Sequence, residues 1–152
     1  MDPFRMQDHV RLPLSQDAAL VAALAATAMP FAHSAEDQAE RWLRAMRLHG
    51  HVGAALQALG VGEAPLMTRA ESTTAEPAPA APSGDMAQRV VERADMLAHA
   101  RHAPCVGTVD LLFALFEEYG GLLDRALYLR GASRDELTEH LAGMGEPAEV
   151  RA

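Results

Sequence analysis

The chain has 152 residues, a formal net charge of −8 and a hydrophobic fraction of 49%. This length fits one domain of ordinary size, and no apolar run reaches the roughly 18 residues that a membrane-spanning helix needs. The acidic balance, without a basic stripe, argues against nucleic acid as a partner. The sequence contains no lysine, isoleucine or asparagine. Their joint absence indicates a GC-rich genome, and the missing lysine excludes a Walker-type ATPase and Schiff-base chemistry.

Cysteine usage and the N-terminal sequence bear on the compartment. Cys105 is the single cysteine, so an internal disulfide is excluded. The first residues show no basic segment followed by an apolar stretch, which a secretion signal would require. We therefore expect a cytoplasmic protein with no membrane span and no bound cofactor.

Helical periodicity fills the first half of the chain, residues 9–61. Ser15 is placed to cap a first helix, which Pro30 ends. A second helix is predicted to start near Ser34 and to bury Trp42, and a short third helix is predicted to end at Gly60. Strand-like alternation is absent from this half.

A Pro- and Ala-rich stretch at residues 62–84 reads as a linker to a second helical half, residues 84–145. There the pattern predicts a helix before Pro104, a helix capped by Thr108 that stops at Gly120, and two more helices on either side of Gly131. Residues 1–8 and 146–152 are expected to be flexible termini.

The two halves repeat each other. At an offset of 69 positions several small and apolar residues coincide, and a two-residue shift then pairs the glycine stops Gly60 and Gly131. The clearest matches at the first offset are Val21 with Val90, Leu43 with Leu112 and Met46 with Leu115. An internal duplication of a helical unit is the simplest explanation, and such units normally share one core. We therefore predict an all-α domain made of two pseudo-symmetric four-helix-type repeats.

The second half resembles the Clp N-terminal repeat. The resemblance covers Ala87 to Ala132 and includes a V-G-T step at Val106–Thr108, the pattern L-L-x-A-L at Leu111–Leu115 and a two-glycine turn. The first half resembles the same repeat more weakly. In Clp-type AAA+ unfoldases such a domain precedes the motor ring and receives substrates and adaptors.

This resemblance implies a non-enzymatic interaction module. It would bind peptides, adaptors or substrates and would regulate or feed a Clp AAA+ unfoldase or protease. An alternative is the N-terminal substrate-receiving domain of a larger AAA+ ATPase, either a disaggregase or a secretion-associated unfoldase. The two differ in whether the reading frame continues into a motor.

Two positions resemble the phosphoarginine pocket of one branch of this family, which pairs a hydroxyl residue with a glutamate 25 positions later. Ser15 and Glu40 have this spacing in the first half. The corresponding positions in the second half are Gly84 and Val109, with Asp110 next door. The resemblance therefore implies at most one such site, and Asp110 is kept as a further binding candidate.

Aromatic side chains are candidates for an apolar groove that holds a peptide. Phe113 lies outside the helix face formed by Leu111, Leu112 and Leu115, so its side chain should be exposed to solvent unless something covers it. Phe116 and Tyr119 follow on the same helix, and the edge of Trp42 is a further candidate although its register places it in the core.

A Cys/His constellation supplies the remaining alternative, a small metal or hydrolase protein. His99, His102 and Cys105 follow at intervals of three. Pro104 interrupts the helix that would align them, and no fourth ligand or orienting group is nearby in sequence. We therefore predict no catalytic and no metal-binding residue.

Overall fold

The computed structural model describes residues 11–61 and 83–144, and all of its regular structure is helical. The prediction of an all-α fold is confirmed for these residues. The predicted flexible termini and nearly all of the predicted linker lie outside them. The last two linker positions, Ser83 and Gly84, belong to the first turn of a helix, so the second helical half begins slightly earlier than expected.

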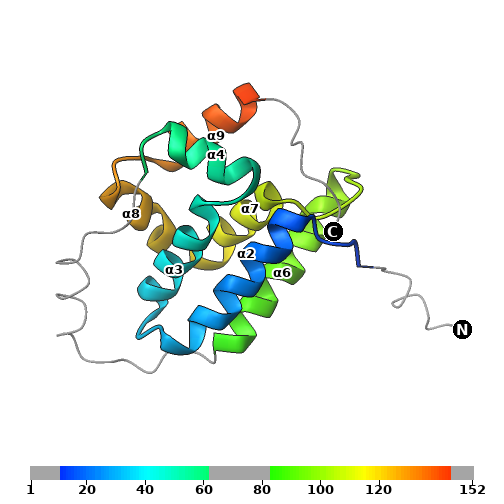
Figure 1. The fold of residues 1–152 in the computed structure, drawn as a ribbon, viewed down its shortest axis with the longest axis horizontal. Coiled ribbons are helices and arrows are strands. Elements are labelled where there is room, and N and C mark those ends of the chain that lie inside the picture. Colours follow the sequence, from blue (N-terminus) through cyan, green and yellow to red (C-terminus); the bar gives the residue numbers. More distant parts are fainter. Residues whose placement is uncertain (1–10, 62–82, 145–152) are drawn as a thin grey trace, which may run out of the picture.

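The described part of the first half, residues 11–61, contains three α-helices and one short 3-10 helix (Figure 1). Helix α2 spans Gln16–Ala28 and continues into the short 3-10 helix η1, Met29–Phe31. Helix α3 spans Ala35–Arg47 and α4 spans Gly50–Ala58. The second half contains α6, Ser83–Ala100; α7, Thr108–Tyr119; α8, Gly121–Leu129; and α9, Arg134–Met144.

Local capping explains where α2 and α3 begin. The Ser15 hydroxyl accepts a hydrogen bond from the Ala18 amide at 2.9 Å, and the Ser34 hydroxyl accepts one from the Asp37 amide at 3.1 Å. Each serine satisfies one backbone donor that the first helical turn leaves unpaired. The predicted cap at Ser15 and the predicted start of a helix near Ser34 are therefore confirmed.

The start of α7 differs from the prediction. Gly107, not Thr108, is the N-cap, and the Asp110 carboxylate accepts a hydrogen bond from the Gly107 amide at 2.9 Å. Thr108 is the first helical residue, and its hydroxyl accepts a hydrogen bond from the Val52 amide of α4 at 3.2 Å. Its hydroxyl therefore joins two helices that are far apart in sequence.

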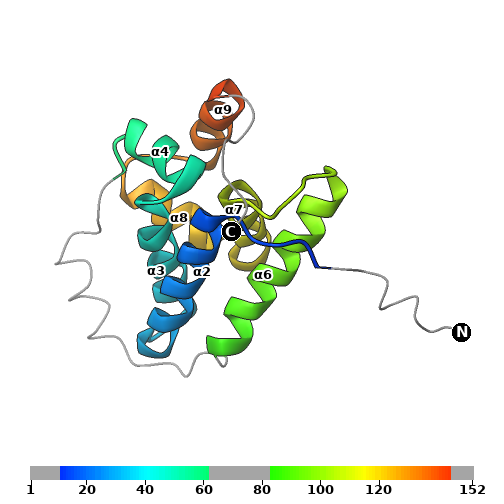
Figure 2. The ribbon, with the colours of Figure 1, turned by 45° about the vertical axis from the view of Figure 1, so that its right-hand side comes forward.

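Helices of one half pack on helices of the other. α3 packs against α8 and α4 packs against α7, while α2 lies against both α3 and α6 (Figures 1 and 2). α9 packs on α4. All described helices thus build one shared core, which agrees with the expectation that the two halves share one.

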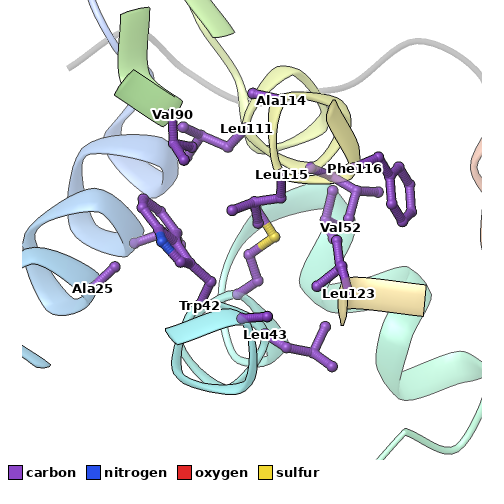
Figure 3. Close-up of a cluster of buried hydrophobic side chains, with 14 of the residues drawn as sticks. Ala25, Trp42, Leu43, Val52, Val90, Leu111, Ala114, Leu115, Phe116 and Leu123 are labelled. Atoms are coloured by element: carbon purple, nitrogen blue, oxygen red, sulfur yellow. The ribbon is translucent and has the colours of Figure 1, made fainter. Parts of the chain in front are cut away.

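The core centres on large apolar side chains of α3 and α7 (Figure 3). Trp42, Leu43, Leu111 and Leu115 are at most 1% exposed. Around them α2, α4, α6 and α8 contribute smaller or branched side chains, which include Ala25, Val52, Val90 and Leu123. Alanine on α2 and α6 lets these helices approach the core closely.

The segment before α2 is tied to the second half. The Leu12 amide donates to the Asp95 carboxylate of α6 at 2.8 Å. Leu14 forms an isolated parallel bridge with Val106, in which the Ser15 amide donates to the Val106 carbonyl at 2.8 Å. These bonds fix the start of α2 beside the loop that precedes α7.

Candidate functional site

Ser15 is a buried capping residue. It is fully buried, and its hydroxyl and amide are used by the Ala18 and Val106 bonds described above. Its role in this structure is to start α2 and to hold the preceding segment against the second half.

Glu40 lies in the second turn of α3 and is half-buried. α2 and α3 run antiparallel, so the start of α2 is near the end of α3 (Figure 1). The pairing of these two residues in a phosphoarginine pocket stays a prediction.

Asp110 is held by three hydrogen bonds. Arg101 donates to its two carboxylate oxygens at 2.8 and 2.7 Å, in addition to the bond from the Gly107 amide. Its side chain is 3% exposed, whereas that of Arg101 is 39% exposed. Two-pronged pairing of this kind is among the stronger ionic contacts in proteins. Asp110 therefore stabilises the α6–α7 connection and offers little surface to a ligand.

The aromatic candidates are largely internal. Trp42 is fully buried, Phe116 is 5% exposed and Tyr119 is 6% exposed. Phe113 is half-buried instead of exposed, because its ring lies beside that of Phe116, with 6.0 Å between the ring centroids. The guanidinium of Arg134 covers Phe116 at 4.3 Å from the ring centroid. These side chains fill the interior and do not line an open groove.

Tyr119 connects α7 to α3. Its hydroxyl donates a hydrogen bond to the side-chain carbonyl of Gln38 at 2.8 Å, and Gln38 is itself 2% exposed. Burial raises the pKa of Tyr119 to about 12, and the neighbouring Trp42 indole opposes part of this rise. The indole N–H meets no acceptor with hydrogen-bond geometry among the described residues.

The Cys/His candidates do not converge. His102 is exposed at the end of α6 in a left-handed conformation with φ of 56°, and Cys105 is buried. His99 instead approaches the Asp95 carboxylate at 3.7 Å. Within residues 11–61 and 83–144, no group of three or more His, Cys, Asp or Glu side chains is placed to hold a metal ion.

The structure shows a hollow that the sequence did not indicate. It has a volume of about 290 Å³, opens to solvent between α4 and α9, and is lined by Leu59, Glu136, Glu139 and His140. Enclosed sites for small molecules measure about 300 to 1,000 Å³. This hollow suits one long side chain of a partner, and its two carboxylates favour a cationic one.

Glu136 also has a structural function at this hollow. Its carboxylate accepts a hydrogen bond from the Ser133 amide at 3.1 Å, while the Ser133 hydroxyl accepts one from the Glu136 amide at 3.1 Å. This reciprocal arrangement is a capping box, which fixes the first turn of α9. The Ser133-x-x-Glu136 spacing was visible in the sequence, but the sequence did not show that Leu59 lies beside Glu136.

An apolar face on α2 is the second surface that sequence reasoning missed. Leu20 and Leu24 are each 44% exposed, and Phe31 at the end of η1 is 66% exposed. The sequence does carry a sign of this face, because no charged residue occurs from Ala18 to Ala32. A helix that is apolar on every side is normally covered on every side.

None of the described helices is long and apolar enough to cross a membrane. No protein-family model and no curated protein sequence matches the chain.

Proposed function

We propose that this chain is a Clp N-type interaction module of two pseudo-symmetric repeats, which binds peptides, adaptors or clients of a Clp AAA+ unfoldase. The observation that carries the proposal is the reciprocal packing of the two halves. α3 of the first half packs on α8 of the second, and α7 of the second packs on α4 of the first. A duplicated unit folded about a pseudo-twofold axis requires such exchanged pairs.

Matched helix ends support the same repeats. α4 and α8 each contain 9 residues, and each is followed by a glycine in the left-handed region: Gly60 with φ of 80° and Gly131 with φ of 88°. Glycine adopts this conformation without the steric cost that a side chain adds. The pairing of these two stops was predicted from the sequence offset, and their matching backbone conformations favour a common origin.

The hollow between α4 and α9 is the binding surface that best fits the proposal. Leu59 adds apolar surface to its lining, and Glu136 and Glu139 add two carboxylates beside His140. An arginine side chain can lay its methylene stem on the leucine and direct its planar guanidinium at the carboxylates. The proposed module therefore recognises an arginine-bearing segment at this end of the bundle, in the cytoplasm of a bacterium.

Peptide titration tests the binding surface. An unfolded, arginine-bearing peptide is titrated into the protein by calorimetry, beside a copy in which citrulline replaces arginine. We expect the citrulline peptide and the double variant Glu136→Gln/Glu139→Gln each to bind about tenfold more weakly, because each removes the charge attraction. Glutamine at position 136 keeps the capping box, so α9 should remain intact.

Glu117→Gln is the matched control, since Glu117 is exposed on α7 and pairs with Arg93 at 3.1 Å, away from the hollow. Equal binding of the arginine and citrulline peptides would reject this surface. A second assay tests the partner class: a purified Clp-type unfoldase, together with its protease, degrades a fluorescent unfolded client with and without the protein. Unchanged degradation, together with no binding to the unfoldase, would reject the proposed function.

A further inference from the structure

The outer face of α2 is unlike the rest of the described surface. Its exposed positions carry no charge: they hold Gln16 and otherwise only leucine, alanine, threonine, proline and phenylalanine, in a protein whose net charge is −8. Leu20 and Leu24 are one helical turn apart, and Phe31 extends the same surface through η1. No described helix passes in front of α2 in Figure 1. Exposed contiguous apolar surface of this kind usually marks an interface.

We propose that the α2 face binds a second copy of this chain, in a twofold, antiparallel helix pair. This inference is independent of the proposed function. Charge is the first reason for choosing a second copy. Most other surfaces would bring carboxylates of two acidic molecules together, whereas the α2 face brings uncharged atoms together.

Shape is the second reason. A twofold interface must be complementary to itself, because the same patch serves both subunits. Along the α2 face the large residues Leu20, Leu24 and Phe31 are separated by smaller exposed ones, Ala23 and Thr27. In an antiparallel pair, each large side chain of one copy can sit over a small residue of the other.

The few charged residues near the ends of α2 favour antiparallel packing of the two copies. Asp17 lies in the first turn, and Arg41 lies at the other end, where its guanidinium donates to the Phe31 carbonyl at 3.3 Å. The Arg41 guanidinium also pairs with Asp37 at 3.2 Å and keeps further N–H groups for another acceptor. Antiparallel packing places Asp17 of one copy toward Arg41 of the other, whereas parallel packing would place the two Asp17 carboxylates together.

The size of the face sets the strength of the dimer. α2 is about 20 Å long at 1.5 Å per residue. One helix face per copy is at the small end of specific interfaces, below about 1,200 Å² in total. We therefore expect a dimer with a dissociation constant on the order of 100 µM.

Sedimentation equilibrium over a concentration series tests the dimer. The full chain should associate with concentration, and added salt should preserve or strengthen association because it screens the repulsion between two acidic copies. Leu24→Arg should weaken association at least tenfold. Tyr128→Arg is the matched control, since Tyr128 is an exposed apolar residue on α8 with 76% exposure.

Cross-linking tests the antiparallel arrangement. Ala23 lies near the middle of the face, so Ala23→Cys should form a disulfide-linked dimer on oxidation, while Ala54→Cys on the exposed side of α4 should not. The natural Cys105 is buried.

A monomer at about 1 mM, well above the expected dissociation constant, would overturn the proposal. The proposal would also be overturned if Tyr128→Arg removes the association and Leu24→Arg leaves it unchanged. Circular dichroism shows whether Leu24→Arg is folded. If Leu24→Arg affects only the binding of a client or unfoldase to a monomer, the face belongs to that partner and the dimer is rejected.

Discussion

The hydroxyl of Tyr119 donates a hydrogen bond to the side-chain carbonyl of Gln38 at 2.8 Å, deep between α7 and α3. The two residues come from different halves of the chain, so this bond is a polar link across the shared core. Because both groups are buried, each depends on the other to avoid the cost of an unpaired polar atom.

Removing the phenol should therefore destabilise the fold. We expect Tyr119→Phe to lower the free energy of unfolding by about 1 to 3 kcal/mol, since the Gln38 carbonyl loses its donor. Urea unfolding followed by circular dichroism measures this loss. The double variant Tyr119→Phe/Gln38→Met should recover part of it, because both polar groups are then gone; an unchanged or larger loss would argue against the link.

Stability at high pH should depend on the same phenol. Burial raises the pKa of Tyr119 to about 12, above the ordinary value of 10.0, so the unfolded chain loses this proton first. Stability is then fully retained below pH 10 and falls as pH rises toward about 12. Chemical unfolding measured across this range should show a decline that is smaller in Tyr119→Phe. Equal declines in both proteins would contradict the assignment.

Asp110 and Arg101 should contribute unequally to the free energy of unfolding, although they form one ion pair. Asp110→Ala removes the acceptor of the Gly107 amide and leaves the start of α7 uncapped, so we expect a loss of about 2 to 3 kcal/mol. Arg101 is partly exposed, and Arg101→Ala should cost about 1 kcal/mol or less. Thermal unfolding of both variants tests this order, and equal losses would show that the ion pair, not the bond to the Gly107 amide, dominates.

His102 occupies a position that favours glycine. It ends α6 with φ of 56°, where its amide donates to the His99 carbonyl at 3.0 Å and the next amide, of Ala103, donates to Ala98 at 2.9 Å. This is a Schellman-type ending, in which glycine avoids the strain of a side chain. We expect His102→Gly to stabilise the protein by about 0.5 to 1 kcal/mol. Gly131→Ala is the opposite test at φ of 88° and should destabilise it.

Close packing between α3 and α4 should make Gly53 intolerant of a methyl group. A Cβ atom at this position would lie 2.8 Å from the Met46 carbonyl oxygen and 3.1 Å from that of Arg47. We expect Gly53→Ala to cost about 1 to 3 kcal/mol, because backbone atoms cannot move aside cheaply. Gly143→Ala in α9 has open space and should be neutral or slightly stabilising. Similar unfolding midpoints for the two variants would refute the close approach.

Local features of the fold could be predicted, whereas features that depend on tertiary contact could not. The caps Ser15 and Ser34 act on amides three residues away, so the sequence alone reveals them. Thr108 was misassigned as a cap because its partner, Val52, lies 56 positions away. Helical spacing placed Phe116 on α7 but could not show that Arg134 of α9 covers its ring.

The candidate sites divide in the same way. The resemblance singled out Ser15 and Glu40 by spacing, and the structure adds that the Ser15 hydroxyl is buried as the cap of α2. The uncharged run around Leu20 and Leu24 was readable from composition, whereas the hollow beside Leu59 needs α4 and α9 to meet. The hollow therefore depends on contact between the two halves, whereas the apolar face belongs to α2 alone.

The bond between Leu12 and Asp95 has a consequence for how the chain folds during synthesis. These residues are 83 positions apart, and the neighbouring bridge from Leu14 reaches Val106. A ribosome delivers the start of α2 long before it delivers either partner. Contacts at such sequence distance slow folding, because a long loop must close first. We therefore expect the first half to complete its folding only after most of the second half has left the ribosome, and α2 to stay exposed until then.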